Sequence, residues 1–260
     1  MKAMILAAGL GTRMRPLTNT VPKPLLPVGG TPLIVWNLLL LRRHGFREVV
    51  INLHHLGPLI EHALGDGRRF GMRISYSREP VILGTGGGIK QVESFFNGRP
   101  GLVLNGDTLF ELDLSELVEF HQVREAAATL VLREDPDAAQ WGLVEIDGAR
   151  RILRINGQGR ESREESFPRM FAGVHLLHPR LLRSLRAGQP SSIIEAYLSA
   201  IARDEPVLGF DLTGYWSDIG TPERYAQAER DVANGRISLA ARNDASPAHT
   251  PTQQQNGSQA

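Results

Sequence analysis

Short apolar runs alternate with helical segments through about the first 125 residues, and this alternation constrains the fold more than any other feature of the sequence. The apolar runs predict buried strands at 2–8, 48–53, 72–76 and 101–105. The helical patterns between them extend over 31–45, 56–64 and 88–96. Because neighbouring parallel strands need such crossover helices, this half of the chain is predicted to form a doubly wound α/β sheet.

The residues that follow two of these strands point to a ligand site. In doubly wound sheets, ligands bind at the carboxyl ends of the strands. Here a loop rich in glycine, arginine and proline, residues 9–23, follows the first strand, and Asp107 follows the fourth. We therefore expect a ligand site where these two segments meet.

The second half of the chain is richer in strands, and no linker separates it from the first. Apolar runs predict strands at 128–132, 142–146, 151–155, 170–177 and 207–211. We expect one domain over residues 1–235, in which this half forms a smaller β-rich lobe on the substrate side. Residues 240–260 contain no Val, Ile, Leu, Met or aromatic residue, so they are predicted to be a disordered, low-complexity tail.

Composition excludes several classes of protein and of site. The formal net charge is +1, which gives no field strong enough to attract nucleic acid or a membrane surface. There is no cysteine, which excludes a disulfide framework, a cysteine nucleophile and a thiolate metal site, and which fits a cytoplasmic protein. The longest apolar run, residues 33–41, is too short to span a bilayer.

The loop after the first strand carries the strongest chemical signal. Gly9 and Gly11 let backbone N–H groups approach phosphate oxygens, and Arg13 can bind such oxygens with two N–H groups at once. Lys23, which stands between two prolines, adds a compact second cation. Met14 stands where a dinucleotide-binding motif has its third glycine, and the loop does not match a P-loop either. The alternative is a tight turn with solvated arginines.

Three further segments carry weaker signals. The glycines of 84–88 allow a base or a phosphate to approach the backbone, although a flexible loop is the alternative. Asp107 and Asp218 stand at turns where a carboxylate can bind Mg²⁺, which prefers one or two carboxylates plus substrate phosphates, or simply cap the turn. The histidines at 54, 55 and 62 have no acidic partner at ligand spacing, so we interpret them as surface residues or as neighbours of the site.

Together these segments resemble the sugar-1-phosphate nucleotidyltransferase family. The long G-x-G-T-R-x-R-P-L-T…P-K-P segment is similar to that family's signature, and L-N-G-D and W-x-D-I-G-T-P follow in the same order. The resemblance covers residues 1–235. It implies a Rossmann-like nucleotidyltransferase fold, with a mostly parallel central sheet and helices on both of its faces.

The resemblance also implies a role for individual residues. Arg13 and Lys23 are the expected catalytic residues, and Asp107 and Asp218 are expected to hold the cofactor Mg²⁺. The nucleotide is expected at Ala8, Gly9, Gly11, Thr12, Arg13, Gly84, Thr85 and Asp107. The sugar is expected at Trp141, Gly142 and Gly173. The implied reaction is a direct displacement in which a phosphate oxygen of the sugar 1-phosphate attacks the α-phosphorus of a nucleoside triphosphate.

Two departures from the family pattern leave the substrates open. Asn156–Gly159 stands where many members carry a Glu-Lys pair, and Phe171–Gly173 stands where many have Asn-Ala-Gly. The second departure and the short length resemble the muramate-1-phosphate uridylyltransferases, whereas L-G-T-G at 83–86 resembles the mannose- or heptose-1-phosphate guanylyltransferases. We predict a mannose-1-phosphate guanylyltransferase-like enzyme that prefers GTP.

Three alternatives remain open at this point. The first is a uridylyltransferase that uses UTP and a muramate- or glucose-type sugar 1-phosphate. The second is a cytidylyl- or uridylyltransferase that acts on another phosphorylated acceptor, such as a phosphosugar alcohol. The third is a regulatory protein that binds a nucleotide-sugar without catalysis, although such a sensor has no need to keep both Asp107 and Asp218.

Overall fold

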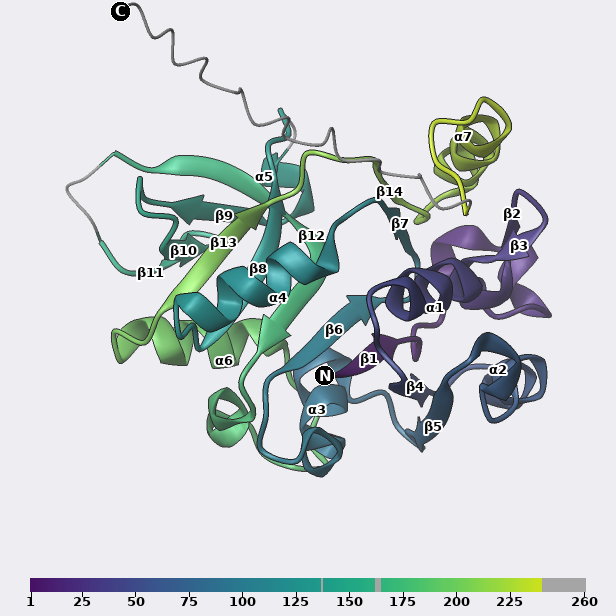
Figure 1. Ribbon diagram of the computed structural model, residues 1–260, viewed down its shortest axis with the longest axis horizontal. Coiled ribbons are helices and arrows are strands. Elements are labelled where there is room, and N and C mark those ends of the chain that lie inside the picture. Colours follow the sequence, from purple (N-terminus) through teal and green to yellow (C-terminus); the bar gives the residue numbers. More distant parts are fainter. Residues whose placement is uncertain (137, 162–164, 240–260) are drawn as a thin grey trace, which may run out of the picture.

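A computed structural model of the protein describes residues 1–136, 138–161 and 165–239 (Figure 1). In these residues the strands of the main sheet are β1 (Lys2–Leu6), β4 (Glu48–Leu53), β5 (Arg73–Arg78), β6 (Gly101–Asn105), β8 (Ala128–Arg133), β9 (Leu143–Ile146), β10 (Ile152–Ile155), β11 (Gln158–Gly159), β12 (Phe167–Leu177) and β13 (Val207–Asp211). Their order is β11-β10-β9-β12-β6-β1-β4-β5, and β8 joins β12 to β13. The predicted tail, residues 240–260, lies outside the described residues.

The nucleus of this sheet is parallel, as the alternating pattern predicts. Strand β1 pairs in parallel with β4 on one side and with β6 on the other, and β5 pairs in parallel with β4. The sheet then changes character at β12, which runs antiparallel to β6, β8 and β9. The α/β class and the β-rich second half are therefore confirmed, and the two halves share one continuous sheet.

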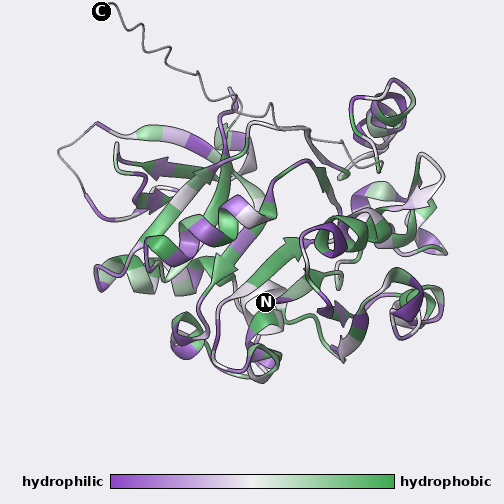
Figure 2. Cartoon of the chain, viewed as in Figure 1, coloured by the Kyte–Doolittle hydropathy of each residue, from purple (hydrophilic) through white to green (hydrophobic). Residues whose placement is uncertain are grey.

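Helices cover both faces of the sheet, in the arrangement that the sequence predicts. They are α1 (Leu33–Arg43), α2 (Gly57–Leu64), α3 (Gly84–Gln91), α4 (Leu114–Val123), α5 (Ala138–Trp141), α6 (Ile193–Ala202) and α7 (Pro222–Ala233). Apolar residues of α1, α2 and α4 share one core with the sheet, whereas those of α3 and α6 share a second core. Figure 2 shows β6 as mostly hydrophobic and α4 as alternating between hydrophobic and hydrophilic residues, which is typical of a surface helix.

The two cores hold the sheet in place for the site. Leu38 of α1 and Ile51 of β4 are fully buried in the first core, and Ile89 of α3 is fully buried in the second. Truncating such a side chain to alanine typically costs about 2–5 kcal/mol, because a cavity remains. A third, smaller core joins α7 to the first loop of the chain through residues such as Met14, Trp36 and Ala228.

The helix predicted at 88–96 differs from the structure at its start. Helix α3 begins at Gly84, so the glycine run forms its first turns, and a separate 3₁₀ helix follows at Glu93–Phe96. A Cβ atom at Gly86 or Gly87 would lie within 3 Å of the backbone of 189–192. The glycines therefore let α3 pack directly against that segment, which offsets their poor helix propensity.

Short elements that the periodicity does not predict complete the fold. A two-stranded ribbon pairs β7 (Thr108–Phe110) with β14 (Trp216–Asp218), and a second ribbon pairs β2 (Pro27–Val28) with β3 (Thr31–Pro32). The other 3₁₀ helices lie at Thr12–Met14, Leu17–Asn19, Lys23–Leu25, Arg68–Phe70 and Pro179–Ser184. The first ribbon has the larger consequence, because it joins two chain segments that are more than 100 residues apart.

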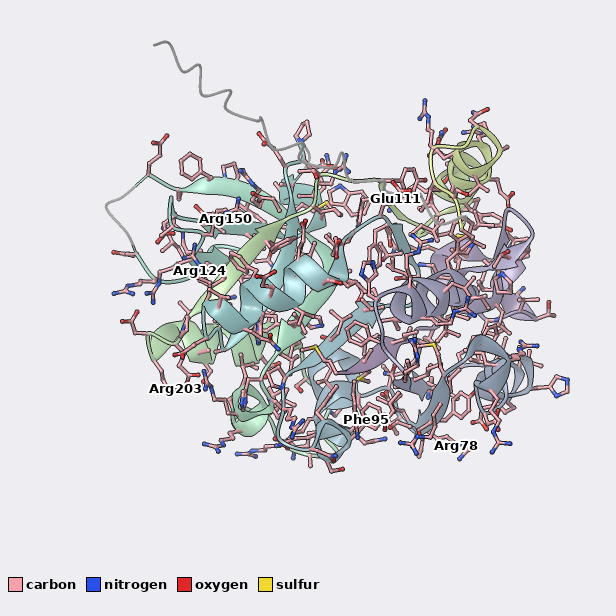
Figure 3. All side chains as sticks on the ribbon, in the orientation of Figure 1. Arg78, Phe95, Glu111, Arg124, Arg150 and Arg203 are labelled. Carbon is pink, nitrogen blue, oxygen red and sulfur yellow. The ribbon has the colours of Figure 1, made fainter. Side chains whose placement is uncertain are left out.

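Charged side chains extend outward around the molecule, among them Arg78 at the end of β5 and Arg203 after α6 (Figure 3). Arg78 pairs with Glu61 at 2.6 Å and Arg203 with Glu205 at 2.7 Å. Exposed pairs of this kind contribute about 0–1 kcal/mol each, so the cores and not these pairs hold the fold. None of the helices in the described residues has the length and apolar character needed to cross a membrane.

Candidate active site

A pocket of about 490 Å³ opens at the carboxyl ends of the parallel strands, within the size range of small-ligand sites. The loop after β1 forms one wall of it, and the start of α3 forms another. Its lining includes the predicted nucleotide residues Ala8, Gly9, Gly11, Thr12, Arg13, Gly84, Thr85 and Asp107, together with Lys23. A larger cleft of about 890 Å³, between α1, α4 and residues 235–239, contains none of the predicted site residues.

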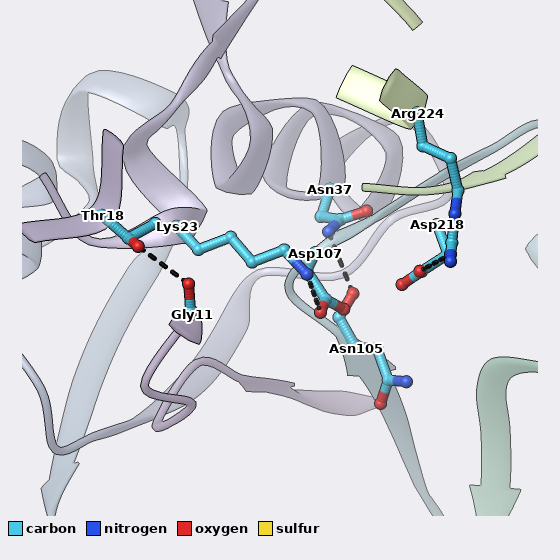
Figure 4. Close-up of polar contacts among 8 residues, drawn as sticks. All are labelled: Gly11, Thr18, Lys23, Asn37, Asn105, Asp107, Asp218 and Arg224. Carbon is cyan, nitrogen blue, oxygen red and sulfur yellow. Dashed lines mark hydrogen bonds and ion pairs between the residues drawn. The ribbon is translucent and has the colours of Figure 1, made fainter. Parts of the chain in front are cut away.

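The loop after β1 is fixed by contacts within its own turns. The Thr18 hydroxyl donates to the Gly11 carbonyl at 2.8 Å (Figure 4). The Met14 amide donates to the same carbonyl at 2.9 Å. The Met14 side chain is fully buried, which anchors the short 3₁₀ turn that carries Arg13. A Cβ atom at Gly9 would meet nothing within 4 Å, so the backbone there faces open space. The loop therefore places its glycine backbone and the exposed guanidinium of Arg13 along the pocket.

Lys23 lies at the pocket floor and is paired with Asp107. Its Nζ lies 2.6 Å from Asp107 Oδ2, and its side chain is only 9% exposed, against 33% for Asp107 (Figure 4). A buried ammonium needs such a partner, because losing its hydration costs several kcal/mol that an anion must offset. Lys23 therefore holds a fixed position, aimed at the carboxylate that follows β6.

The β7–β14 ribbon brings Asp218 beside Asp107. Asp218 pairs in register with Thr108, and the Ile219 amide donates to the Asp107 carbonyl at 3.0 Å. Burial and the neighbouring Asp107 charge raise the pKa of Asp218, while Lys23, Arg224 and Arg13 act in the opposite direction. Two carboxylates this close repel each other, so the pair gains free energy when a cation lies between them.

Arg224, which no motif of the sequence marks, neutralises Asp218. It lies in the first turn of α7, and its Nη1 donates to Asp218 Oδ2 (Figure 4). The same guanidinium lies 4.4 Å from the centre of the Trp141 ring. The polar sequence of α7 gives no sign of this role, because an arginine there is equally typical of a solvated helix face.

The carboxylate pair fits a magnesium ion better than an ion that needs an all-protein cage. Within 1–136, 138–161 and 165–239, the structure contains no group of three or more His, Cys, Asp or Glu residues that can hold a metal. Mg²⁺ is commonly held by one or two carboxylates plus substrate phosphates, and the pair Asp107 and Asp218 supplies that number. His54 and His55 instead bond to backbone carbonyls, of Glu79 and Thr18.

A chain of buried hydrogen bonds through Asn52 and Glu79, the Asn52–Glu79 relay, connects the β1 loop to the start of α3. The sequence did not predict this feature. The Ala7 amide donates to Asn52 Oδ1 at 2.8 Å, and Asn52 Nδ2 donates to Glu79 Oε1 at 2.8 Å. The Leu83 amide then donates to Glu79 Oε2 at 2.9 Å. Asn52 and Glu79 are 2% and 3% exposed, and both line the pocket. A polar residue inside the apolar strand EVVINL is the signal that points to Asn52.

The predicted sugar residues Trp141, Gly142 and Gly173 lie outside the lining of the pocket. Trp141 meets Trp216 edge to face at 5.4 Å, and Trp216 donates from its indole N–H to the Ala172 carbonyl at 3.0 Å. Gly173 follows in β12, next to Val174, which pairs with Leu104 of β6. Gly142 follows Trp141 directly at the end of α5. The structure thus brings these residues to the same end of the sheet as Asp107.

Comparison with known proteins shows which family of enzymes this chain resembles along its length. A family model described as nucleotidyl transferase matches residues 2–235. The chain is 40% identical over 234 residues to the N-acetylmuramate alpha-1-phosphate uridylyltransferase of Neisseria meningitidis, and the match covers 88% of this chain and 97% of that protein. It is 30% identical over 235 residues to the mannose-1-phosphate guanylyltransferase of Mycobacterium tuberculosis. That match covers 90% of this chain but only 65% of the mycobacterial protein, which is less than two thirds.

A solved structure agrees with the fold. A crystal structure from Bacillus anthracis, assigned as a glucose-1-phosphate thymidylyltransferase, superimposes with a TM-score of 0.77 at 24% identity. The superposition covers 93% of this chain and 98% of that one. The mixed sheet with a parallel nucleus is thus shared along nearly the whole chain.

Proposed function

This chain belongs to the sugar-1-phosphate nucleotidyltransferase family, and from that premise we propose that it joins a nucleoside triphosphate to a sugar 1-phosphate and releases pyrophosphate. One observation carries the proposal. The β7–β14 ribbon sets Asp107 and Asp218 side by side where the glycine-lined pocket meets the sugar-side residues. Two anionic substrates that meet there need cations and carboxylate-bound metal between them.

The proposed reaction is a single displacement. A phosphate oxygen of the sugar 1-phosphate forms a new bond to the α-phosphorus of the triphosphate. The bond from that phosphorus to the bridging oxygen of the β-phosphate breaks, and pyrophosphate leaves with the electron pair. The attacking phosphate is already an anion at neutral pH, so no protein group has to remove a proton. Catalysis then consists of positioning and charge stabilisation.

The residues divide these tasks by position. The loop from Ala8 to Thr12 presents backbone N–H groups to the triphosphate, and Arg13 neutralises charge at its exposed side. Lys23 is buried and paired with Asp107, and we propose that its charge stabilises the attacked phosphate when that phosphate lies beside this carboxylate. Gly84 and Thr85 line the pocket and would contact the base. The Thr85 hydroxyl accepts a hydrogen bond from the Ile193 amide at 3.0 Å, which fixes the start of α3.

Magnesium is the proposed cofactor. Asp107 and Asp218 would hold it, and it would supply Lewis-acid stabilisation of the phosphate oxygens. The fit rests on the two adjacent carboxylates. Burial of Asp218, and second to it the charge of Asp107, raises the pKa of Asp218, so a further cation beside the pair would stabilise its charged form. We propose no nucleic acid or membrane partner, in line with the net charge of +1. We also propose that the reaction takes place in the cytoplasm.

UTP with an N-acetylmuramate-type sugar 1-phosphate is the first substrate pair that we propose. The Neisseria uridylyltransferase supports it, because the match has the higher identity and covers nearly the whole of that protein. GTP with mannose 1-phosphate is the second candidate, favoured by the L-G-T-G segment at 83–86. Relatives of both kinds share this family, so the pair has to be measured.

A substrate matrix tests the proposal. The full chain is incubated with GTP, UTP, CTP and dTTP against N-acetylmuramate, mannose and glucose 1-phosphates and a phosphosugar alcohol, with and without Mg²⁺. Pyrophosphate release and the nucleotide-sugar product are measured together. We expect release only when both substrates and Mg²⁺ are present. Tight binding of a nucleotide-sugar with no release from any pair would favour the regulatory alternative and refute the enzyme.

A further inference from the structure

We propose that Arg224 is a positioning residue that competes with a divalent cation for Asp218, and that it leaves this carboxylate when the cation binds. The inference rests on the proposed function, since it concerns the same pair of carboxylates. It goes further by assigning an internal counter-ion to the site, and by connecting metal binding to the aromatic residues on the sugar side.

The contacts of Arg224 connect the two sides of the site. Its guanidinium donates to Asp218 and lies over the Trp141 ring at 4.4 Å. Trp141 in turn meets Trp216, which lies in β14 two residues before Asp218. A cation over the face of an indole is a favourable contact. Arg224 therefore has two partners, a carboxylate and an aromatic ring, and it can keep the second when it gives up the first.

Gly220 makes room for this convergence of charges. A Cβ atom at Gly220 would collide with Asp218 Oδ2 and would lie 3.2 Å from both Arg13 Nη2 and Arg224 Nη1. The guanidinium groups of Arg13 and Arg224 thus approach the Asp218 carboxylate at the space left by the missing side chain of Gly220. Because like charges repel, part of this cluster is under electrostatic strain, and an incoming cation at Asp218 favours the departure of one arginine.

Arg224, and not Lys23, is the residue able to move. The side chain of Lys23 is 9% exposed, whereas that of Arg224 is 34% exposed. The backbone of Arg224 is fixed, because Thr221 caps α7 and accepts a hydrogen bond from the Arg224 amide. Long side chains on fixed helices change rotamer readily when exposed. The movement is therefore confined to the guanidinium.

The inference predicts that removing the Arg224 charge strengthens metal binding. Without its counter-ion, the carboxylate pair attracts a divalent cation more strongly, and the metal no longer has to displace anything. We expect the Kd for Mn²⁺ to fall about five- to tenfold in Arg224→Gln, as partly exposed charge pairs allow. Arg224→Lys should stay near the wild-type value, because it keeps a cation at this position.

The experiment measures Mn²⁺ binding to the full chain without substrates, by the electron paramagnetic resonance of the free ion. Arg230→Gln is the matched control, since Arg230 lies on the same helix and bonds only to Gln227 among the interactions that we observe in the described residues. A second readout is tryptophan fluorescence in a Trp36→Phe background, which leaves Trp141 and Trp216. We expect Mn²⁺-induced changes in this signal in the wild type, and their loss in Arg224→Gln.

The outcomes separate this inference from the proposed function. Equal or weaker Mn²⁺ affinity in Arg224→Gln, or an unchanged metal-dependent fluorescence signal, would overturn the inference even if the enzyme is fully active. Absence of Mn²⁺ binding in both proteins would overturn it as well. Failure of every substrate pair to release pyrophosphate would instead refute the proposed function, whatever the metal affinities are.

Discussion

The proposed triphosphate side and the proposed sugar side of the site are built by different means. On the triphosphate side, backbone groups of the β1 loop and of α3 form the walls, and the Asn52–Glu79 relay connects them through buried hydrogen bonds. On the sugar side, half-exposed side chains such as Trp141 and Arg224 contact one another across three separate elements. Backbone walls joined by buried hydrogen bonds are positioned before a substrate binds, whereas half-exposed side chains can still change rotamer.

Neutralising Asp107 or Asp218, the carboxylates at the junction of the two sides, should have the largest effect on turnover. Asp107→Asn and Asp218→Asn keep the shape of each side chain but remove its charge. We expect turnover to fall by roughly 10³-fold or more, because charge stabilisation by the bound cation is lost. Steady-state kinetics and circular dichroism measure turnover and folding for both variants. Near-normal kcat in both would contradict the metal assignment and the mechanism built on it.

Removing Arg13 or Lys23, the two cations of the triphosphate side, should have the second-largest effect on turnover. Arg13→Ala and Lys23→Ala remove charges that matter most as charge redistributes at the attacked phosphorus. We expect kcat to fall by roughly 10²- to 10³-fold, about 3–4 kcal/mol, as when other preorganised donors are deleted. A rise in KM with unchanged kcat would mean that both cations bind substrate and transition state equally. Changes within about 0.5 kcal/mol would mean that they are ordinary surface residues.

These two sides also differ in how far the sequence predicts them. The β1 loop is contiguous, so Arg13 and Lys23 could be read directly from residues 9–23. The carboxylate pair could be named, but its adjacency depends on the β7–β14 ribbon, which is too short to leave a period-2 pattern. Arg224 could not be predicted, because its role exists only through contacts with residues far away in the chain. Side-chain sites assembled from distant elements leave no local pattern.

The lobe on the sugar side should lose stability in acid. His175 of β12 is fully buried and hydrogen-bonded to Tyr197 of α6, and burial lowers its pKa to about 3 from an ordinary value of 6.5. His175 therefore binds a proton near pH 6.5 in the unfolded chain but stays neutral at that pH in the folded chain. The contribution of His175 to the free energy of unfolding is fully present above pH 6.5. Below pH 6.5 this contribution falls by about 1.4 kcal/mol for each pH unit, until the pH reaches the pKa of His175 in the folded chain.

Urea unfolding at pH 7, 6 and 5 measures this loss. The double variant His175→Leu/Tyr197→Phe removes both polar partners and leaves no buried group without a partner. We expect its stability to depend less on pH than that of the wild type, by about 2 kcal/mol between pH 6.5 and pH 5. His62→Gln, at an exposed position on α2, should keep the wild-type dependence. Equal pH dependence in the double variant and the wild type would show that His175 is protonated in the folded chain.

A change in the Asn52–Glu79 relay should alter the KM for the triphosphate and not the KM for the sugar 1-phosphate. Glu79→Gln places an amide N–H group opposite the amide donors of Asn52 and Leu83, so one hydrogen bond is lost and the β1 loop shifts relative to α3. We expect the KM for the triphosphate to rise about tenfold, in line with about 1–2 kcal/mol for a disturbed buried hydrogen bond. The KM for the sugar 1-phosphate should stay near the wild-type value. Glu119→Gln, an exposed change on α4, is the control.

The smallest effect is expected on the sugar side, where a substitution should change the KM for the sugar 1-phosphate and not that for the triphosphate. Trp141→Leu removes the ring that Arg224 lies over and the edge contact with Trp216, but it touches none of the residues that line the triphosphate pocket. Since each such aromatic contact contributes about 0.5–1 kcal/mol, we expect the KM for the sugar 1-phosphate to rise roughly three- to fivefold, with the KM for the triphosphate unchanged. Glu79→Gln and Trp141→Leu then serve as controls for each other in one set of two-substrate kinetics. If either variant raised both KM values equally, the two sides would act as one cooperative unit, because a disturbance in one would reach the other through Asp107 and Asp218.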